Sequence, residues 1–390
     1  MNEITENQYA HWLFNLSGFG NTTIDKLLST GLSCSEIYEN KGKEFAGILT
    51  SRQIKTFDET KHIWNFEKEA KKLADKGIIF VPRIDERFPD KLKNILNAPF
   101  ALYLKGELPN PSKPSVAIIG ARMCSEYGRY MARNFGRGLA LAGVQVISGM
   151  ARGIDGVSQK AALAAGGKSF GIVGNGVDVC YPEENIDIYE ELCCNGGVIS
   201  EFPPGTMPKA SFFPMRNRII SGLADIILVI EAREKSGTQI TVDTALEQGR
   251  EVLAVPGRAT DRLSDGCNLM ISQGAGVALD VQDVLDRIHV IEGENEEKIT
   301  ASATTKFSPS ESATTENAAE EILANGGVER TLEDHILEIL DVIPLSTSYI
   351  MEELEKRNVD VTVPTLLMTL TEMVYKGLVS QNGAYFLKAS

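Results

Sequence analysis

The sequence is poor in metal-binding residues and in positive charge. Its 4 His are scattered and its 6 Cys form no Cys-x-x-Cys pair, so we expect neither a structural zinc site nor a Ser-His-Asp triad. Lys and Arg number 39 against 53 Asp and Glu, which gives a formal net charge of −14. That balance disfavours a grip on nucleic acid or acidic lipid by the whole surface. A chain-wide sum does not exclude a local basic pocket.

Long apolar runs and a secretory leader are also missing. No hydrophobic stretch approaches the length of a membrane span, and the opening residues MNEITENQYA contain no basic segment followed by an apolar core. We therefore expect a cytoplasmic protein with no membrane partner. Its cysteines are expected to be buried free thiols in a reducing compartment. No cofactor and no metal is expected.

The apolar pattern of the first 290 residues predicts two different modules. Residues 1–76 read as helices around a Gly-Phe-Gly turn and resemble a SAM or helix-hairpin-helix domain. Such a hairpin can offer backbone amides to a DNA phosphate, although a compact helical module explains the same letters. Residues 77–290 form the second module, and from position 114 it alternates short β-branched strands with helices. This rhythm predicts an α/β fold, a Rossmann-like doubly wound parallel sheet.

The remaining residues predict a linker and a third module. Residues 291–330 are rich in Ser, Thr, Ala and Glu with no apolar period, which is typical of a disordered acidic linker. Residues 331–390 contain three helical segments and a hairpin signal at Asn382-Gly383, as in a winged helix. Because the recognition segment is nearly devoid of Lys and Arg, contact with another protein is favoured over DNA readout.

In a doubly wound sheet, ligands bind outside the carboxyl ends of the strands. The residues that follow each predicted strand are therefore candidates for a binding site. Lys168 near the start of the third strand is added, as is a Ser-Gly-Thr turn before a helix, whose amides suit an anion. The candidates are Gly120, Arg122, Ser148, Gly149, Arg152, Lys168, Phe213, Arg216, Asn217, Arg218, Ser236, Gly237 and Thr238.

The stretch SFFPMRNRIISG, residues 211–222, raises the question of why so acidic a chain places two arginines at the edge of its own core. It places Arg216 and Arg218 after two phenylalanines and directly before the apolar run LADIILVIEA. The planar guanidinium fork of arginine suits phosphate, and Phe212, Phe213 or Met215 could supply a surface on which a base stacks. We interpret the stretch as part of a phosphate-binding pocket.

Each candidate also has a purely structural explanation. Arg122 or Arg152 could form a salt bridge to Asp155 or Asp178, and the Ser-Gly-Thr turn could simply cap a helix. The combination of donors at several strand ends favours an anion site. By contrast, GGKS at 166–169 follows a helix and precedes a strand, which is the wrong order for a P-loop.

Taken in order, the motifs resemble those of the DNA-processing protein A family, DprA or Smf. They are YLKGEL, VAIIGAR, VISGMARGID, GNGVDVCYPEEN, ISEFPPGT, FPMRNRIISGLA, EKSGTQIT, EQGREVLAVPG and GCNLMISQGA. The resemblance implies a single-stranded DNA-binding protein that is not an enzyme. Such a protein protects DNA and loads the RecA recombinase onto it in natural transformation or related recombination. It also implies a homodimer formed through the Rossmann-like domain.

The resemblance further assigns roles to particular residues. It implies that Arg122, Lys168 and the FFPMRNR segment line the DNA pocket, with Gly120 and Ser148–Gly149 as its floor. Ala121 departs from the family, which more commonly has serine there.

Two other functions stay open. One is a nucleotide-binding or nucleotide-processing Rossmann enzyme, although Thr241 stands where the PGGxGTxxE group of such enzymes carries its glutamate. The other is an adaptor that senses a free nucleotide.

Overall fold

The computed structural model describes residues 4–291, 331–340, 345–357, 359, 361–382 and 385–388. The chain divides into two compact units, Met1–Glu292 and Gly293–Ser390. Apart from residue 291, the expected acidic linker at 291–330 lies outside the described residues, as does Gly383 of the expected hairpin turn. Within the described ranges, no helix combines the length and the apolar character needed to cross a membrane.

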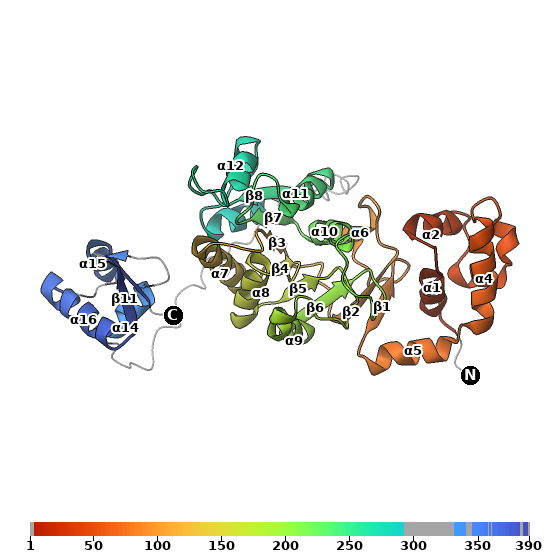
Figure 1. Cartoon of the computed structure of the whole chain (residues 1–390), viewed down its shortest axis with the longest axis horizontal. Coiled ribbons are helices and arrows are strands. Elements are labelled where there is room, and N and C mark those ends of the chain that lie inside the picture. Colours follow the sequence, from red (N-terminus) through yellow and green to blue (C-terminus); the bar gives the residue numbers. More distant parts are fainter. Residues whose placement is uncertain are drawn as a thin grey trace, which may run out of the picture. The chain divides into compact units, whose positions relative to one another are not determined.

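The N-terminal residues are helical (Figure 1). The elements are α1 (Glu6–Phe14), α2 (Asn21–Leu28), α3 (Cys34–Glu39), η1 (Gly42–Phe45), α4 (Ser51–Ile63) and α5 (Phe66–Asp75). Thr5, Ser33 and Thr50 each form a capping box, which fixes where α1, α3 and α4 begin. These helices bury Trp12 and Leu13 in one apolar cluster with residues of the first two strands.

A nine-stranded sheet organises the rest of the first unit, in the order β1-β2-β6-β5-β4-β3-β7-β8-β9. The strands are β1 (Ile79–Pro82), β2 (Ala101–Gly106), β3 (Ser115–Ile119), β4 (Gln145–Ser148), β5 (Ser169–Ile172), β6 (Gly196–Ser200), β7 (Ile226–Val229), β8 (Glu251–Ala254) and β9 (Gly276–Val277). Neighbours from β6 to β9 pair in parallel, while β1 and β2 are antiparallel additions at one edge. The predicted Rossmann-like α/β core is confirmed.

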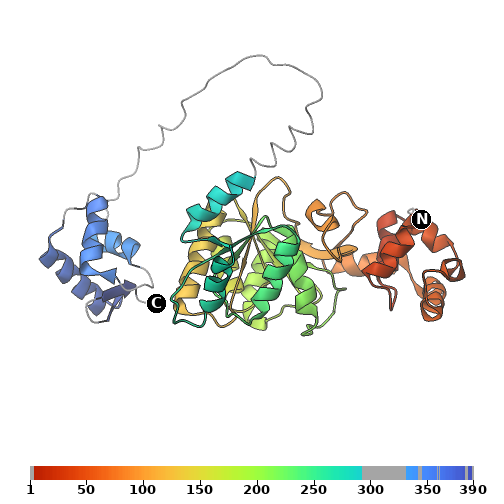
Figure 2. The same cartoon turned by 90° about the horizontal axis from the view of Figure 1, so that it is seen from above.

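Helices cover both faces of this sheet (Figure 2). The helices are α6 (Asp90–Lys93), α7 (Glu126–Leu141), α8 (Ile154–Ala164), α9 (Ile186–Asn195), α10 (Phe212–Leu223), α11 (Gly237–Glu247) and α12 (Asp265–Ser272), with a 3-10 turn η2 (Glu183–Asn185) before α9. Phe135 of α7 packs against Val116 and Ile118, whereas Ile220 of α10 packs with Ala117 and Ile119 on the other face. Alternate residues of β3 therefore pack against the helices on the two faces of the sheet.

The strand order reverses between β3 and β7. From β3 the chain proceeds to β4, β5 and β6 on one side, then returns so that β7 pairs with β3 on the other. At such a switch point the loops leaving the two strands turn to opposite faces and leave a crevice at the carboxyl edge. The fold thus places the residues after β3 and β7 at the expected position for a ligand.

The second unit is a small helical domain with its own sheet. It contains α14 (Leu332–Ile339), β10 (Leu345–Ser346), α15 (Thr347–Lys356), α16 (Val363–Tyr375), β11 (Val379–Asn382) and β12 (Tyr385–Lys388). The strands pair in the order β10-β12-β11, and Ile336, Leu354 and Leu370 bury one apolar cluster. Thr362 caps α16 and Pro364 occupies its first turn, where the absent N–H costs no hydrogen bond.

His11 couples the first unit to pH. Its ring lies 4.7 Å from that of Phe80 and 5.5 Å from that of Trp64, centroid to centroid. Burial lowers the pKa of His11 to about 4, while an unfolded chain titrates near 6.5. Between these values the unfolded state binds the extra proton, so stability present at neutral pH is lost as the pH falls.

We expect the unfolding free energy to drop by about 2 kcal/mol between pH 7 and pH 5 through His11 alone. The measurement is urea unfolding at both pH values, where wild type should show this drop and His11→Phe should not. His62→Phe, which replaces an exposed histidine of α4, is the control. An equal pH dependence in wild type and His11→Phe would contradict the assignment.

Candidate functional site

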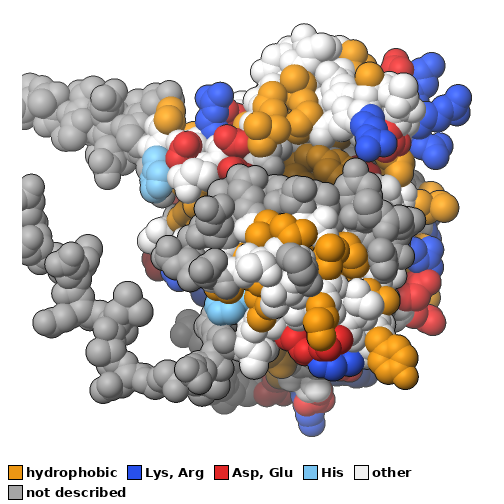
Figure 3. Space-filling model, turned by 90° about the vertical axis from the view of Figure 1, so that its left-hand side faces the viewer, with side chains coloured by type: hydrophobic (Ala, Val, Ile, Leu, Met, Phe, Trp, Pro, Cys, Tyr) orange, Lys and Arg blue, Asp and Glu red, His pale blue; other side chains and the backbone are white. Residues whose placement is uncertain are grey.

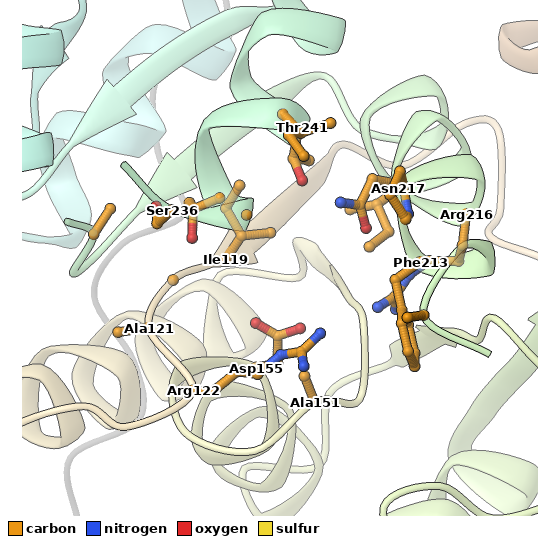
Figure 4. Close-up of a pocket in the computed structure, with 18 of the residues that line it drawn as sticks. Ile119, Ala121, Arg122, Ala151, Asp155, Phe213, Arg216, Asn217, Ser236 and Thr241 are labelled. Atoms are coloured by element: carbon orange, nitrogen blue, oxygen red, sulfur yellow. The ribbon is translucent and has the colours of Figure 1, made fainter. Parts of the chain in front are cut away.

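A cavity of about 820 Å³ opens at the carboxyl ends of β3 and β7 (Figure 4). Its walls come from the loops after β3, β4, β5, β6 and β7, the start of α8, and the helices α10 and α11. Eight of the sequence-predicted residues line it: Gly120, Arg122, Phe213, Arg216, Asn217, Ser236, Gly237 and Thr238. Most of the residues chosen because they follow strands or begin helices therefore line one cavity.

The cavity is positively charged although the chain is acidic. Its charged lining residues are the cations Arg122, Lys209, Arg216 and Arg233 and the single carboxylate Asp155. Figure 3 shows another aspect of the protein, a face on which acidic and basic side chains are interspersed among apolar ones wherever the structure describes it. Within the cavity lining the cations outnumber the carboxylate four to one, which suits a site for an anion.

Arg216 is the least expected member of this lining, because its side chain is buried and only 4% of the residue is exposed. One terminal nitrogen, Nη1, donates to the carbonyl oxygens of Gly149 (2.7 Å) and Ile172. Its Nε has no partner among the described residues. Burial lowers the pKa of Arg216 to about 10, and the nearby Asp155 carboxylate opposes that shift. A buried cation with an unmet N–H beside a cavity is suited to hold an anionic ligand.

Asp155 and Gly149 hold Arg216 in this position. Asp155 is buried at the start of α8 and accepts a hydrogen bond from the Gly149 N–H at 3.0 Å. Burial raises the pKa of Asp155, and the charge of Arg216 acts against that rise. A Cβ on Gly149 would collide with the Arg216 guanidinium, so only glycine leaves room for the arrangement.

Phe213 presents a ring beside two cations. The Arg122 guanidinium lies 5.3 Å from the ring centroid and that of Arg216 lies 5.9 Å away. The ring of Tyr181, which also lines the cavity, is 5.9 Å from the Phe213 ring. Figure 4 shows Phe213 and Asn217 projecting from α10 on the side of the cavity opposite Ser236. Aromatic and guanidinium groups together favour a ligand that has both a flat ring and a negative charge.

The N-terminus of α11 forms the opposite wall. Ser236 occupies the cap position, yet its side chain makes no capping hydrogen bond and its Oγ is buried without a partner among the described residues. The alternative that the Ser-Gly-Thr turn simply caps the helix therefore explains the position of Ser236. It does not explain why the Ser236 hydroxyl is buried without a partner among the described residues. The hydroxyl and the helix N-terminus can both serve an anion.

Three predicted residues lie outside the cavity lining near the same edge. Ser148 is fully buried and donates its hydroxyl to the Ile118 carbonyl at 2.6 Å, which ties β4 to β3. Gly149 lies directly beneath Arg216 and supports it. Arg152 is exposed and forms an ion pair with Glu184 at 2.6 Å, which differs from both carboxylates suggested by the sequence.

Lys168 and Arg218 are separated from the cavity. Lys168 precedes β5, at the amino edge of the parallel sheet, and its Nζ lies 3.3 Å from Glu107. Because strand starts and strand ends lie at opposite edges, Lys168 cannot join the residues at the carboxyl edge. Arg218 lies outside the cavity lining and forms a buried ion pair, in which its Nη2 donates to both carboxylate oxygens of Glu201 at 2.7 and 2.8 Å.

α10 explains why the two arginines differ. Arg216 and Arg218 are two positions apart, about 200° around a helix, so they face opposite directions. Pro214 lies in the same stretch and would break a helix if it were in the interior. It occupies the first turn of α10, where its missing N–H has no helical partner to lose.

Sequence reasoning missed Lys209 and Arg233. Arg233 follows β7 closely, so the strand-end rule could have identified it. Lys209 lies three residues before Phe212, and its ammonium is 5.4 Å from that ring centroid. A lysine next to a pair of phenylalanines was the available signal. Thr241 also lines the cavity, so the glutamate of the PGGxGTxxE enzymes has no counterpart at that position.

Comparisons with known proteins identify relatives of this chain. A model of the family described as DNA recombination-mediator protein A matches residues 79–289. The chain is 35% identical over 283 residues to the DNA processing protein DprA of Streptococcus pneumoniae, covering 71% of this chain and 96% of that protein. It is 41% identical over 209 residues to the protein Smf of Escherichia coli, covering 53% and 56%.

Two solved structures of DNA processing protein A also resemble this chain. The X-ray structure of DNA processing protein A from Streptococcus pneumoniae superposes with a TM-score of 0.64 at 34% identity, covering 73% of this chain and 98% of that one. A DNA processing protein A from Helicobacter pylori, described for its single-stranded DNA binding mode, is 28% identical over 54% of this chain and 95% of that one. Its TM-score is 0.48.

The Arg218–Glu201 pair is expected to stabilise the fold without contacting a ligand. Arg218→Met leaves the Glu201 carboxylate buried without its cation, which should cost about 3–5 kcal/mol of unfolding free energy. Arg218→Met combined with Glu201→Leu should recover most of that loss. The control is Lys76→Met at the Lys76–Asp178 pair, whose lysine is about half exposed, and it should cost less than about 1 kcal/mol. Denaturant titration measures all three, and equal losses at the two pairs would contradict the prediction.

Proposed function

The chain belongs to the DNA recombination-mediator protein A family, and from that premise we propose that its cavity binds single-stranded DNA. The bound strand is protected and passed to the RecA recombinase, in natural transformation or a related recombination route. No step of chemistry on the strand is required of the protein.

One observation carries the proposal: the cavity unites four cations with the ring of Phe213. Phosphates carry the negative charge that Arg122 and Arg216 need, and a base supplies the flat surface that Phe213 needs. A free nucleotide offers both groups as well. A strand is preferred because the family premise concerns DNA and because the cavity is open to exposed side chains such as Arg122 and Lys209, past which a chain can continue.

The geometry favours a single strand over a duplex. In a duplex the bases are stacked on each other, so none can reach an aromatic ring inside a cavity. Stacking on an aromatic ring also tolerates any base, which suits a protein that must accept DNA of any sequence. The cations are arginines and a lysine placed for phosphates, and contacts of this kind fix a strand without reading it.

Several finer parts of the proposal rest on the family resemblance. They are the transfer to RecA, a homodimer through the Rossmann-like domain, and action in the cytoplasm. The proposed domains are a helical module at 1–76, the DNA-binding Rossmann-like domain at 77–290, the linker at 291–330 and a winged-helix-like domain at 331–390.

Arg122→Glu should abolish most strand binding, whereas Lys168→Glu should leave it unchanged. The two variants carry the same charge change at opposite edges of the sheet, so they separate a local interaction from the overall field. We expect at least about tenfold weaker binding for Arg122→Glu, because a charged hydrogen bond is removed and a repulsion is added. Fluorescence anisotropy of labelled oligo-dT over a salt series measures this.

The salt series gives a second readout. Removal of one ion pair between an arginine and a phosphate should reduce the slope of log K against log salt by about 0.7 for a single strand. Absence of binding by wild type at low salt would refute the proposal, and the nucleotide-processing alternative would then be assayed by hydrolysis. Equally weakened binding in Arg122→Glu and Lys168→Glu would place the site elsewhere.

Phe213→Leu should weaken binding without changing its salt dependence. Removal of one stacked base costs about 1–3 kcal/mol, or about 5- to 150-fold in affinity. Phe213→Tyr keeps the ring and should bind like wild type. An altered salt slope in Phe213→Leu, or an equally weakened affinity in Phe213→Tyr, would show that the ring supports the arginines instead of a base.

A further inference from the structure

Three arginines form a stripe along the outer side of α7. Arg129, Arg133 and Arg137 are spaced four residues apart, so they lie on one side of the helix, away from the sheet. Met131, Phe135 and Leu139 occupy the buried side against the sheet. We propose that this stripe, the α7 stripe, binds the phosphates of a DNA strand where it continues beyond the cavity. The inference rests on the proposed function of the cavity.

The charges of the α7 stripe are available to a ligand. Arg129 pairs with Glu126 at 3.2 Å, with both side chains largely exposed. Arg133 and Arg137 have no hydrogen bond or ion pair to any described residue. Beyond Glu126, α7 contains no acidic residue. The outer face of α7 therefore carries positive charge that no described residue neutralises, in a chain whose net charge is −14.

The α7 stripe begins where the cavity ends. Arg122 and Met123 line the cavity, and α7 starts three residues later at Glu126. The junction is fixed by Glu231, a buried carboxylate beyond β7, which accepts hydrogen bonds from the Ser125 N–H at 2.9 Å and from the Ser125 hydroxyl. A strand that leaves the cavity past Arg122 therefore meets the start of α7 in a fixed position.

The spacing of the α7 stripe suits a flexible polyanion. A four-residue step along a helix advances about 6 Å, so the three arginines span about 12 Å. Their long side chains can meet successive phosphates without any fixed base geometry.

Strand length separates the α7 stripe from the cavity. A deoxythymidine tetranucleotide is the short probe, chosen for the cavity alone, and a dodecanucleotide is the long probe, chosen to reach the α7 stripe as well. We would compare wild type with Arg133→Glu/Arg137→Glu by anisotropy on both oligonucleotides over a salt series. The control is Lys68→Glu/Lys71→Glu, which makes the same charge change on the exposed side of α5.

Wild type should bind the dodecanucleotide more tightly than the tetranucleotide. The Arg133→Glu/Arg137→Glu variant should bind the dodecanucleotide about tenfold more weakly, with its salt slope reduced by about 1.4 because two phosphates are no longer neutralised. Its affinity for the tetranucleotide should be unchanged. The control should follow wild type on both.

Each other result is decisive. If wild type binds both oligonucleotides with equal affinity, the α7 stripe is a solvated helix face or a surface for an acidic protein segment. The same conclusion follows if the α7 variant binds the dodecanucleotide as tightly as wild type does. If the control is weakened as much, the effect is one of total charge. If the tetranucleotide and dodecanucleotide both fail to bind wild type, the proposed function fails, and this inference with it.

Discussion

The site depends on a positive charge buried at the switch point of the sheet. Arg216 is fixed from below by the Gly149 and Ile172 carbonyls and balanced by Asp155, itself buried. Leaving such a cation partly unpaired is costly, so the surrounding fold must hold it rigidly. That requirement explains why Gly149 has no side chain and why α8 begins with a carboxylate. An anionic ligand, as proposed, would supply the partner that the Arg216 Nε lacks among the described residues.

The same helix also stabilises the scaffold. Arg218 of α10 pairs with Glu201, and Glu201 accepts a further hydrogen bond from Asn21 at 2.7 Å. Asn21 in turn accepts one from the Phe100 N–H at 3.1 Å. α10, the end of β6, the start of α2 and the start of β2 are thereby joined in one network. One helix thus holds the ligand-facing arginine and fixes the N-terminal helices to the sheet.

The sequence predicted the sheet because buried parallel strands leave a plain signal of short β-branched runs. It predicted the cavity because strand ends in such a sheet share one edge, which brought Arg122 and Ser236 together correctly. It misplaced Lys168 because a residue at a strand start lies at the other edge. The sequence did not show that Arg216 and Arg218 have different roles, because the proline between Phe213 and Met215 hides the helix on which they face opposite directions. Their partners, Gly149 and Glu201, are also distant in sequence.

The net negative charge of the chain and its basic cavity both bear on the proposed choice between duplex and single-stranded DNA. A duplex is stiff and presents phosphates along its whole length, so it must approach a broad area of a protein whose net charge is −14. A single strand is flexible and can enter a small cavity with one base and its neighbouring phosphates. In the proposed function, the net negative charge disfavours the broad approach of a duplex, while the cavity and the α7 stripe attract a flexible strand without reading a base. Under that proposal, the distribution of charge matters more for the choice of partner than the net charge does.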